Sequence, residues 1–284
     1  MTNQIVVGHD SSPSSVEAVN WAASEAVARH SALRIVACYE LPISAGAGAG
    51  WLMGDVLTTI RDGTAASAEA IKTSVALGYP DLTISVEVCA GPARESLIQG
   101  LVPTDILVVG TSRHEGVSGF WLGSTARWAG RHSPCPVVIV RGAASRGRPD
   151  RIVVGVDGSA PSDAALLWAA DEADLHRVDL LVVHAWEYAY PGIGTRAEQI
   201  RDVIRIDAAT VLDRSVEVAR ERCGATVQDL LVEGGAATAL LDSSRDGDLL
   251  VVGAEGRSAI AAGLLGSTVN AVVEQASVPV VIVH

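Results

Sequence analysis

Short runs of apolar residues alternate along the chain with longer segments in which apolar residues return at helical spacing. In the first half, the runs that predict strands are residues 5–8, 33–39, 82–88, 106–110 and 137–140. The runs IVVG and ILVVG are apolar without alternation, which is typical of strands buried on both faces of a parallel sheet. Because strands and helical segments alternate, the pattern predicts a doubly wound α/β fold.

The same pattern is repeated in the second half of the chain. Residues 5–26 and 152–173 read IVVGHDSSPSSVEAVNWAASEA and IVVGVDGSAPSDAALLWAADEA, and the segments 105–125 and 248–268 also match. Strands are predicted in this half at residues 152–156, 180–186, 227–233, 249–253 and 280–283. We therefore expect two tandem domains of one fold, with domain 1 at residues 1–142, a linker at 143–150 and domain 2 at 151–284.

Serine, proline and glycine mark the ends of predicted helices in the first half. Ser12 followed by Pro13 predicts a helix start, with Ser12 as the N-cap and Pro13 at the first helical position. The sequence Gly78-Tyr79-Pro80 predicts the end of the second helix, because glycine and proline both interrupt helical structure.

Composition narrows the class of protein. Hydrophobic residues make up 49% and aromatic residues only 4%, so the cores must be built from aliphatic side chains. A net charge of −12 argues against nucleic acid polymers and anionic membranes as partners. The four cysteines form no CxxC pair, which predicts reduced and mostly buried thiols. No apolar run reaches the ~18–20 residues of a membrane span, and polar residues follow Met1, so we expect a cytoplasmic protein.

A glycine-rich segment after the predicted fourth strand is the first candidate site. In the second half, Gly253 and Gly256 are followed by Gly266, Ser267 and Thr268, and a new helix is predicted to begin at Thr268. Glycine lets the backbone approach a ligand closely, and a helix N-terminus offers unpaired N–H groups to phosphate. The alternative is a plain strand-to-helix turn, and the glycine pattern alone does not decide between the two.

An acidic residue at the end of the first strand of each half is the second candidate. Asp10 and its copy Asp157 lie where strands one and four are neighbours, at the crevice of an open α/β sheet. A carboxylate there can hold ribose hydroxyls, or a metal ion attached to phosphates. The alternative is an aspartate that caps the following turn and helix.

Together these segments resemble the universal stress protein family. The residues that carry the resemblance are IVVGVDGS with a following serine, the late G-x2-G-x9-G-[ST] motif, and the CPV and VPV strands. The resemblance covers both halves and is similar to the two-domain members common in actinobacteria. It implies Rossmann-like domains, each a five-stranded parallel sheet of order 3-2-1-4-5 with helices on both faces. It also implies an ATP site in each domain and a role in stress response, dormancy or growth regulation.

The resemblance assigns nucleotide-binding residues by position. In the second half the matching residues are Gly155, Asp157, Gly253, Gly256, Gly266, Ser267 and Thr268. In the first half they are Gly8, Asp10, Gly110, Gly123, Ser124 and Thr125. Arg113 stands where the motif has its second glycine. A side chain there can fill the phosphate path, although arginine is also a good phosphate donor. We therefore expect the second domain to be the better nucleotide site.

An ATP-binding regulator with slow or no hydrolysis is the function that the resemblance implies. Neither glycine loop contains the lysine of a Walker P-loop, and the sequence offers no convincing base and nucleophile, so no residue is given a catalytic role. The alternative is a protein–protein interaction module that uses no nucleotide, which Arg113 favours for one half. A regulatory protein partner is expected, and whether Mg²⁺ accompanies ATP is left open.

The last predicted strands, residues 137–140 and 280–283, are edge strands in the family topology. Exposed apolar edges tend to be paired. We therefore expect the two halves to pair along these strands, and we leave open whether the whole chain also forms a homodimer.

Overall fold

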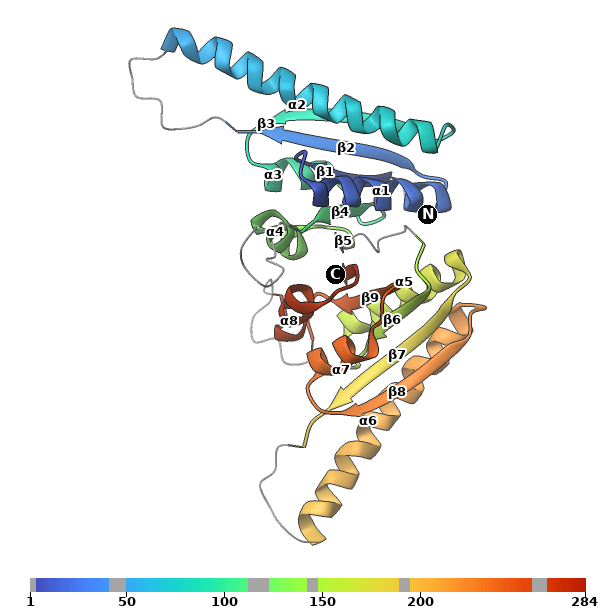
Figure 1. Ribbon diagram of the computed structural model, residues 1–284. Helices are drawn as coiled ribbons and strands as arrows, with labels where there is room; N and C mark the ends of the chain where they lie inside the picture. The colour runs from blue at the N-terminus through green and yellow to red at the C-terminus, as the bar shows by residue number, and fades with distance from the viewer. Residues whose placement is uncertain (1–3, 41–49, 112–122, 142–147, 189–194, 257–264) are drawn as a thin grey trace. The chain divides into compact units, whose positions relative to one another are not determined.

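The computed structural model describes residues 4–40, 50–111, 123–141, 148–188, 195–256 and 265–284. The chain divides into two compact units, Met1–Gly147 and Arg148–His284 (Figure 1). Two tandem domains of one fold are thereby confirmed, whereas the exact limits of the linker at 143–150 stay a prediction.

The first unit alternates strands and helices along the chain. Its elements are β1 (Gln4–His9), α1 (Pro13–Ala28), β2 (Ala32–Tyr39), α2 (Gly50–Gly78), β3 (Ile84–Ala90), α3 (Ala93–Ile98), β4 (Ile106–Gly110), α4 (Ser124–His132) and β5 (Val137–Val140). The strands pair in parallel in the order β3-β2-β1-β4-β5, which confirms the predicted order.

The second unit repeats this arrangement. Its elements are β6 (Arg151–Gly155), α5 (Ala160–His176), β7 (Asp179–Trp186), α6 (Thr195–Arg222), β8 (Val227–Glu233), α7 (Ala236–Ser243), β9 (Asp248–Gly253), α8 (Ser267–Gln275) and β10 (Val280–Val283). The parallel order is β8-β7-β6-β9-β10, the same as in the first unit. The predicted pairing of the two halves along their last strands stays a prediction.

Helices cover both faces of each sheet. In the first unit α1 and α2 pack together against the strands, and α3 and α4 form a second pair (Figure 1). In the second unit α5 pairs with α6, and α7 pairs with α8 (Figure 1). The predicted doubly wound architecture is therefore confirmed in each unit.

Local sequence signals explain where the helices begin and end. Ser12 is the N-cap of α1 and accepts a hydrogen bond from the Ser15 N–H at 3.2 Å, with Pro13 at the first helical position. Ser159 caps α5 in the same way, through the Ser162 N–H. Helix α2 ends at Gly78, as predicted.

Aliphatic side chains fill the cores. Ile5, Val6 and Val7 of β1 are fully buried, as is the stretch Ile152–Val154 of β6. Unalternated apolar strands need two covered faces, and the paired helices supply both covers. Trp21 of α1 is 3% exposed and adds an aromatic side chain to this core.

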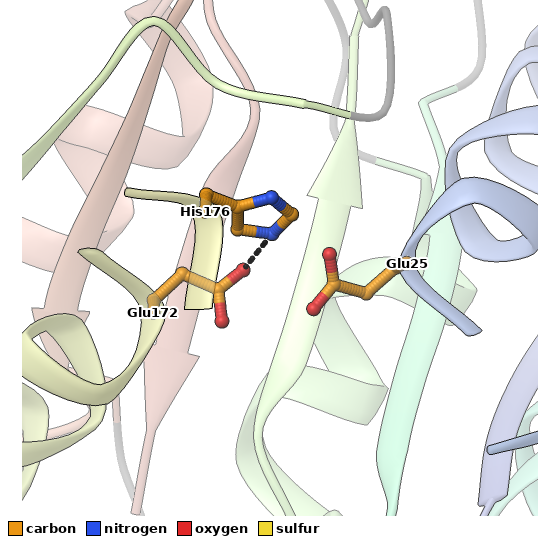
Figure 2. Close-up of side chains that lie close together, drawn as sticks. All are labelled: Glu25, Glu172 and His176. Atoms are coloured by element: carbon orange, nitrogen blue, oxygen red, sulfur yellow. Dashed lines mark hydrogen bonds and ion pairs between the residues drawn. The ribbon is translucent and has the colours of Figure 1, made fainter. Parts of the chain in front are cut away.

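A carboxylate is buried at the same position of the first helix in both units. In α5, Glu172 Oε1 lies 3.1 Å from His176 Nε2 (Figure 2). In α1, the Arg29 guanidinium donates to Glu25. A buried charge is costly unless it is paired, and the partner one helical turn later meets that need within each helix.

None of the described helices is both long enough and apolar enough to cross a bilayer.

Candidate functional site

A cleft opens at the carboxyl edge of the second unit's sheet. Strands β6 and β9 are hydrogen-bonded neighbours, so both of their glycine-containing ends meet there. The cleft encloses about 650 Å³, including its open mouth. Its walls contain every residue that the sequence predicts for this half: Gly155, Asp157, Gly253, Gly256, Gly266, Ser267 and Thr268.

The N-terminus of α8 forms one side of this cleft. Gly266 is the N-cap, and among the described residues no side chain caps the helix. The first turn contains no acidic residue, and Ser267, Thr268 and Val269 line the cleft. The helix begins at Ser267, one residue before the predicted start. An uncapped first turn presents N–H groups and the positive end of the helix dipole, which together suit an anion.

The two ends of the glycine segment are joined by the backbone. The Gly266 N–H donates to the Ala254 carbonyl at 3.1 Å, and the Ala254 N–H donates to the Val283 carbonyl at 2.7 Å. The Asn270 amide donates to the Leu265 carbonyl at 3.0 Å. These bonds hold the start of α8 beside the end of β9. Residues 257–264 lie outside the described part of the chain.

Asp157 lies across the cleft from α8 and caps the turn before α5. Its Oδ1 accepts hydrogen bonds from the Ser159 N–H at 2.9 Å and from the Ser159 hydroxyl at 2.6 Å. The Asp157 N–H in turn donates to the Ser162 hydroxyl at 3.2 Å. The turn-capping alternative for this aspartate is therefore realised, and the same carboxylate also lines the cleft.

The space around an added Cβ differs among the glycines of this cleft. A Cβ on Gly253 would lie 2.6 Å from the Pro161 carbonyl oxygen, so glycine there allows α5 to pack on the strand end. A Cβ on Gly256 would lie 2.8 Å from Asp157 Oδ2. At Gly266 the nearest atom would be 3.7 Å away, so space remains open there. The first two glycines bring backbone and carboxylate close together around the cleft.

The first unit has an equivalent cleft of about 670 Å³. It too contains all of the residues predicted for its half, namely Gly8, Asp10, Gly110, Gly123, Ser124 and Thr125. A Cβ on Gly110 would lie 2.5 Å from the Ser14 carbonyl oxygen, as at Gly253. Helix α4 starts after Gly123, and no described side chain caps it. Arg113, the predicted departure from the motif, lies outside the described residues.

Asp10 repeats the role of Asp157 in the first cleft. Its Oδ1 accepts from the Ser12 N–H at 3.0 Å and from the Ser12 hydroxyl at 2.5 Å. Burial opposes ionisation, but hydrogen bonds from Ser12 and Ser15 and the positive charge of His9 outweigh it, so the pKa of Asp10 is lowered. The carboxylate is therefore ionised at neutral pH.

The two clefts differ in polarity at two equivalent positions of their lining, one after or at the end of the first strand and one in the second strand. His9 and Cys38 line the first cleft where Val156 and Ala185 line the second. His9 Nδ1 lies 3.2 Å from the Ser15 hydroxyl, and its Nε2 lies 3.1 Å from the hydroxyl of Ser67 on α2. Burial lowers the pKa of His9, although Asp10 acts in the opposite direction. The second cleft is thus the more apolar at these positions.

Sequence reasoning missed the leucine wall of each cleft. Leu97 of α3 and Leu240 of α7 line the clefts and pack against the glycines that end the first strands. A Cβ on Gly155 would lie 2.9 Å from Leu240 Cδ1, and one on Gly8 would lie 3.3 Å from Leu97 Cδ1. The only sequence signal was the shared Gly-x-Ala start of these short helices at residues 91–93 and 234–236.

Comparison with known proteins gives a consistent result. The model of the universal stress protein family matches residues 1–141 and again residues 149–284. A universal stress protein of Mycobacterium tuberculosis is 31% identical over 98% of this chain and 95% of its own. A relative in Mycolicibacterium smegmatis is 30% identical over 99% of this chain and 96% of its own.

The solved structures agree on the fold. The crystal structure of a universal stress protein from Archaeoglobus fulgidus superposes with a TM-score of 0.64 at 17% identity, covering 99% of this chain and 98% of that one. With the family model matched twice and full-length relatives in mycobacteria, the chain belongs to the universal stress protein family, as a tandem two-domain member.

Proposed function

We propose that this chain is an ATP-binding regulator of stress response, dormancy or growth, with slow or no ATP hydrolysis, and that its principal site is the cleft of the second unit. The observation that carries the proposal is the uncapped N-terminus of α8, which lines the same cleft as Asp157. Gly253 and Gly256 line this cleft too, and they allow close approach of backbone and carboxylate there. Such an arrangement favours a ligand that is anionic at one end.

The parts of the cleft match the parts of a nucleoside triphosphate. The first turn of α8, with the Ser267 and Thr268 hydroxyls, suits the phosphates. Asp157 suits a ribose hydroxyl, or a Mg²⁺ ion attached to the phosphates. Val183, Ala185 and Leu240 offer an apolar surface to the face of a base.

The residues of this cleft also support slow or no hydrolysis. Among the described residues that line it, none is lysine, arginine or histidine, and the charged side chains are those of Asp157 and Glu255. Phosphoryl transfer relies on positive groups that stabilise charge on the transferring phosphate. Slow or no hydrolysis is therefore part of the proposal, and a measurement of turnover tests it.

A second function is favoured for the first unit by two differences from the second unit. Arg113 replaces a motif glycine there, and the cleft is lined by His9 and Cys38 instead of apolar residues. We propose that this unit binds nucleotide more weakly. Its alternative role is as a module that contacts a regulatory protein partner.

Mass analysis of small molecules released from the purified, denatured chain tests nucleotide binding directly. We expect an adenine nucleotide, and we expect ATP to bind the emptied protein in an equilibrium titration carried out with and without Mg²⁺. A nucleotide-free protein that also shows no heat or fluorescence change with ATP would overturn the proposal. Turnover faster than about 1 s⁻¹ would instead make the chain an enzyme.

A further inference from the structure

Two cysteines of the first unit are neighbours across adjacent strands. Cys38 of β2 and Cys89 of β3 are paired in the parallel register, and both are free and half-buried. Residues opposite each other in a sheet project from the same face. On that face Cys38 lines the first cleft, and the Cys89 thiol donates to Glu87 Oε1 at 3.4 Å.

The spacing of the strands suits a covalent link between these thiols. Adjacent strands lie about 4.8 Å apart, and disulfides join residues whose Cα atoms are about 4.4–6.8 Å apart. Strand β3 is the outer strand of its unit's sheet on this side, with alternate residues half-buried, so it has room to adjust. The pair also faces solvent enough for a small oxidant to reach it.

The second unit shows that the fold does not require this pair. At the equivalent register position, Ala185 of β7 faces Val232 of β8. Ser96 of α3 is likewise replaced by Ala239 in α7. A thiol pair is thus present in one copy of the domain, where the other copy is apolar.

We propose that Cys38 and Cys89 form a dithiol that hydrogen peroxide oxidises to an intramolecular disulfide, which makes the wall of the first cleft at Cys38 a redox modification site. The proposal does not depend on nucleotide binding. Because Cys38 lines the cleft, closing the disulfide alters that wall of the cleft, and reducing it restores the wall.

The chemistry takes place in two steps. A thiolate attacks one peroxide oxygen, so that an S–O bond forms, the O–O bond breaks, and the released hydroxide takes up the thiol proton as water. The second thiol then attacks the sulfenic sulfur, so that the S–S bond forms and a second water leaves. The two thiols lose two electrons, and the peroxide is reduced to water.

The surroundings set the speed of this reaction. Burial raises the pKa of Cys89 to about 11, and its hydrogen bond to Glu87 and the charge of that residue add to the effect. Burial also raises the pKa of Cys38. Since the thiolate is the reactive form, oxidation should be slow at neutral pH and faster as the pH rises.

Peptide mapping of the full chain after treatment with hydrogen peroxide tests the proposal. Free thiols are alkylated under denaturing conditions, and the protein is then digested without reductant. We expect a linked peptide that joins Cys38 to Cys89, and the loss of two of the four alkylatable thiols, with Cys135 and Cys223 unaffected. A thiol reductant should return all four.

The second unit supplies the matched control variants. Cys38→Ala and Cys89→Val introduce the residues that occupy the equivalent positions there, so each should fold, as a melting curve can verify. Either variant should abolish the linked peptide. The proposal would be overturned if the wild type kept all four thiols, linked Cys38 or Cys89 to another cysteine, or oxidised each one separately. None of these results would bear on ATP binding, because the experiment uses nucleotide-free protein.

Discussion

Some residues that line the second cleft also stabilise the fold around it. Gly253 is needed because the Pro161 carbonyl would lie 2.6 Å from an added Cβ, whereas Gly266 has open space around it. Asp157 caps a turn and also lines the cleft. The sequence alone could locate these residues, but it could not separate the two roles. The difference lies in distances to atoms of other elements.

Replacing Gly253 with alanine should therefore destabilise the second unit. The new methyl group would meet backbone rather than a flexible side chain, and overpacking of this kind costs about 1–3 kcal/mol. Gly266→Ala is the matched control and should change stability little, because its nearest neighbour would be 3.7 Å away. Urea unfolding of both variants measures the difference. Equal stabilities would show that the close approach of α5 is not what requires glycine.

His9 should make the stability of the first unit depend on pH. Its pKa in the folded chain is lowered, chiefly by burial, below the unfolded value of about 6.5. The unfolded chain then binds protons more readily, so the stability from neutral His9 is complete above about pH 6.5. It is lost as the pH falls from there to the folded pKa.

The variant His9→Val, which copies Val156 of the second unit, removes this contribution. The melting temperature of the wild type should fall more steeply than that of the variant between about pH 7 and pH 5. Parallel curves for the two proteins would exclude His9 as the source.

At the scale of elements, the helix starts fall into two kinds. Helices α1 and α5 are capped by Ser12 and Ser159, whereas α4 and α8 begin after glycine and face the clefts. A capped start satisfies its own N–H groups, and an uncapped one can offer them to a ligand. Helices α3 and α7 also lack a side-chain cap, so what marks α4 and α8 as the candidate anion-binding ends is that the hydroxyl-bearing residues of their first turns line the clefts.

Serine-to-alanine variants distinguish the two kinds of helix start. Ser159→Ala removes an N-cap and should cost about 1 kcal/mol of stability. Ser267→Ala lies in the first turn of α8, where no serine cap is present, and should leave stability within about 0.5 kcal/mol. Ser267→Ala should weaken ATP binding although it changes stability little, as titration and thermal unfolding can measure. The reverse pattern would contradict the assignment.

Most elements could be predicted from sequence, and the exceptions have a physical reason. Strands such as β4 and β5 have the predicted limits, because unalternated apolar runs between helical segments are distinctive. The leucine wall was missed because α3 has 6 residues and α7 has 8, too few for a helical period to be evident. Arg113 lies outside the described residues, so its predicted effect on the first site stays a prediction.

At the scale of the molecule, one fold is built twice and its clefts are lined differently. The shared parts are the sheet order, the capping aspartate and the uncapped helix. The lining residues that differ are His9 and Cys38 against Val156 and Ala185. In the sequence, Arg113 also stands where the second half has Gly256. The two units can therefore be compared with each other. Residues that they share indicate the common scaffold, and residues that differ lead us to expect unequal nucleotide binding by the two clefts.

An equilibrium titration of ATP onto the variants Gly123→Asp and Gly266→Asp tests the central claim most directly. Aspartate is a good N-cap, so both helices should still form, while the new carboxylate occupies the place proposed for phosphate. We predict that Gly266→Asp weakens the tightest ATP binding at least about tenfold, or about 1.4 kcal/mol, and that Gly123→Asp leaves it nearly unchanged. If Gly266→Asp kept full affinity while Gly123→Asp abolished it, the assignment of the principal site to the second unit would be wrong.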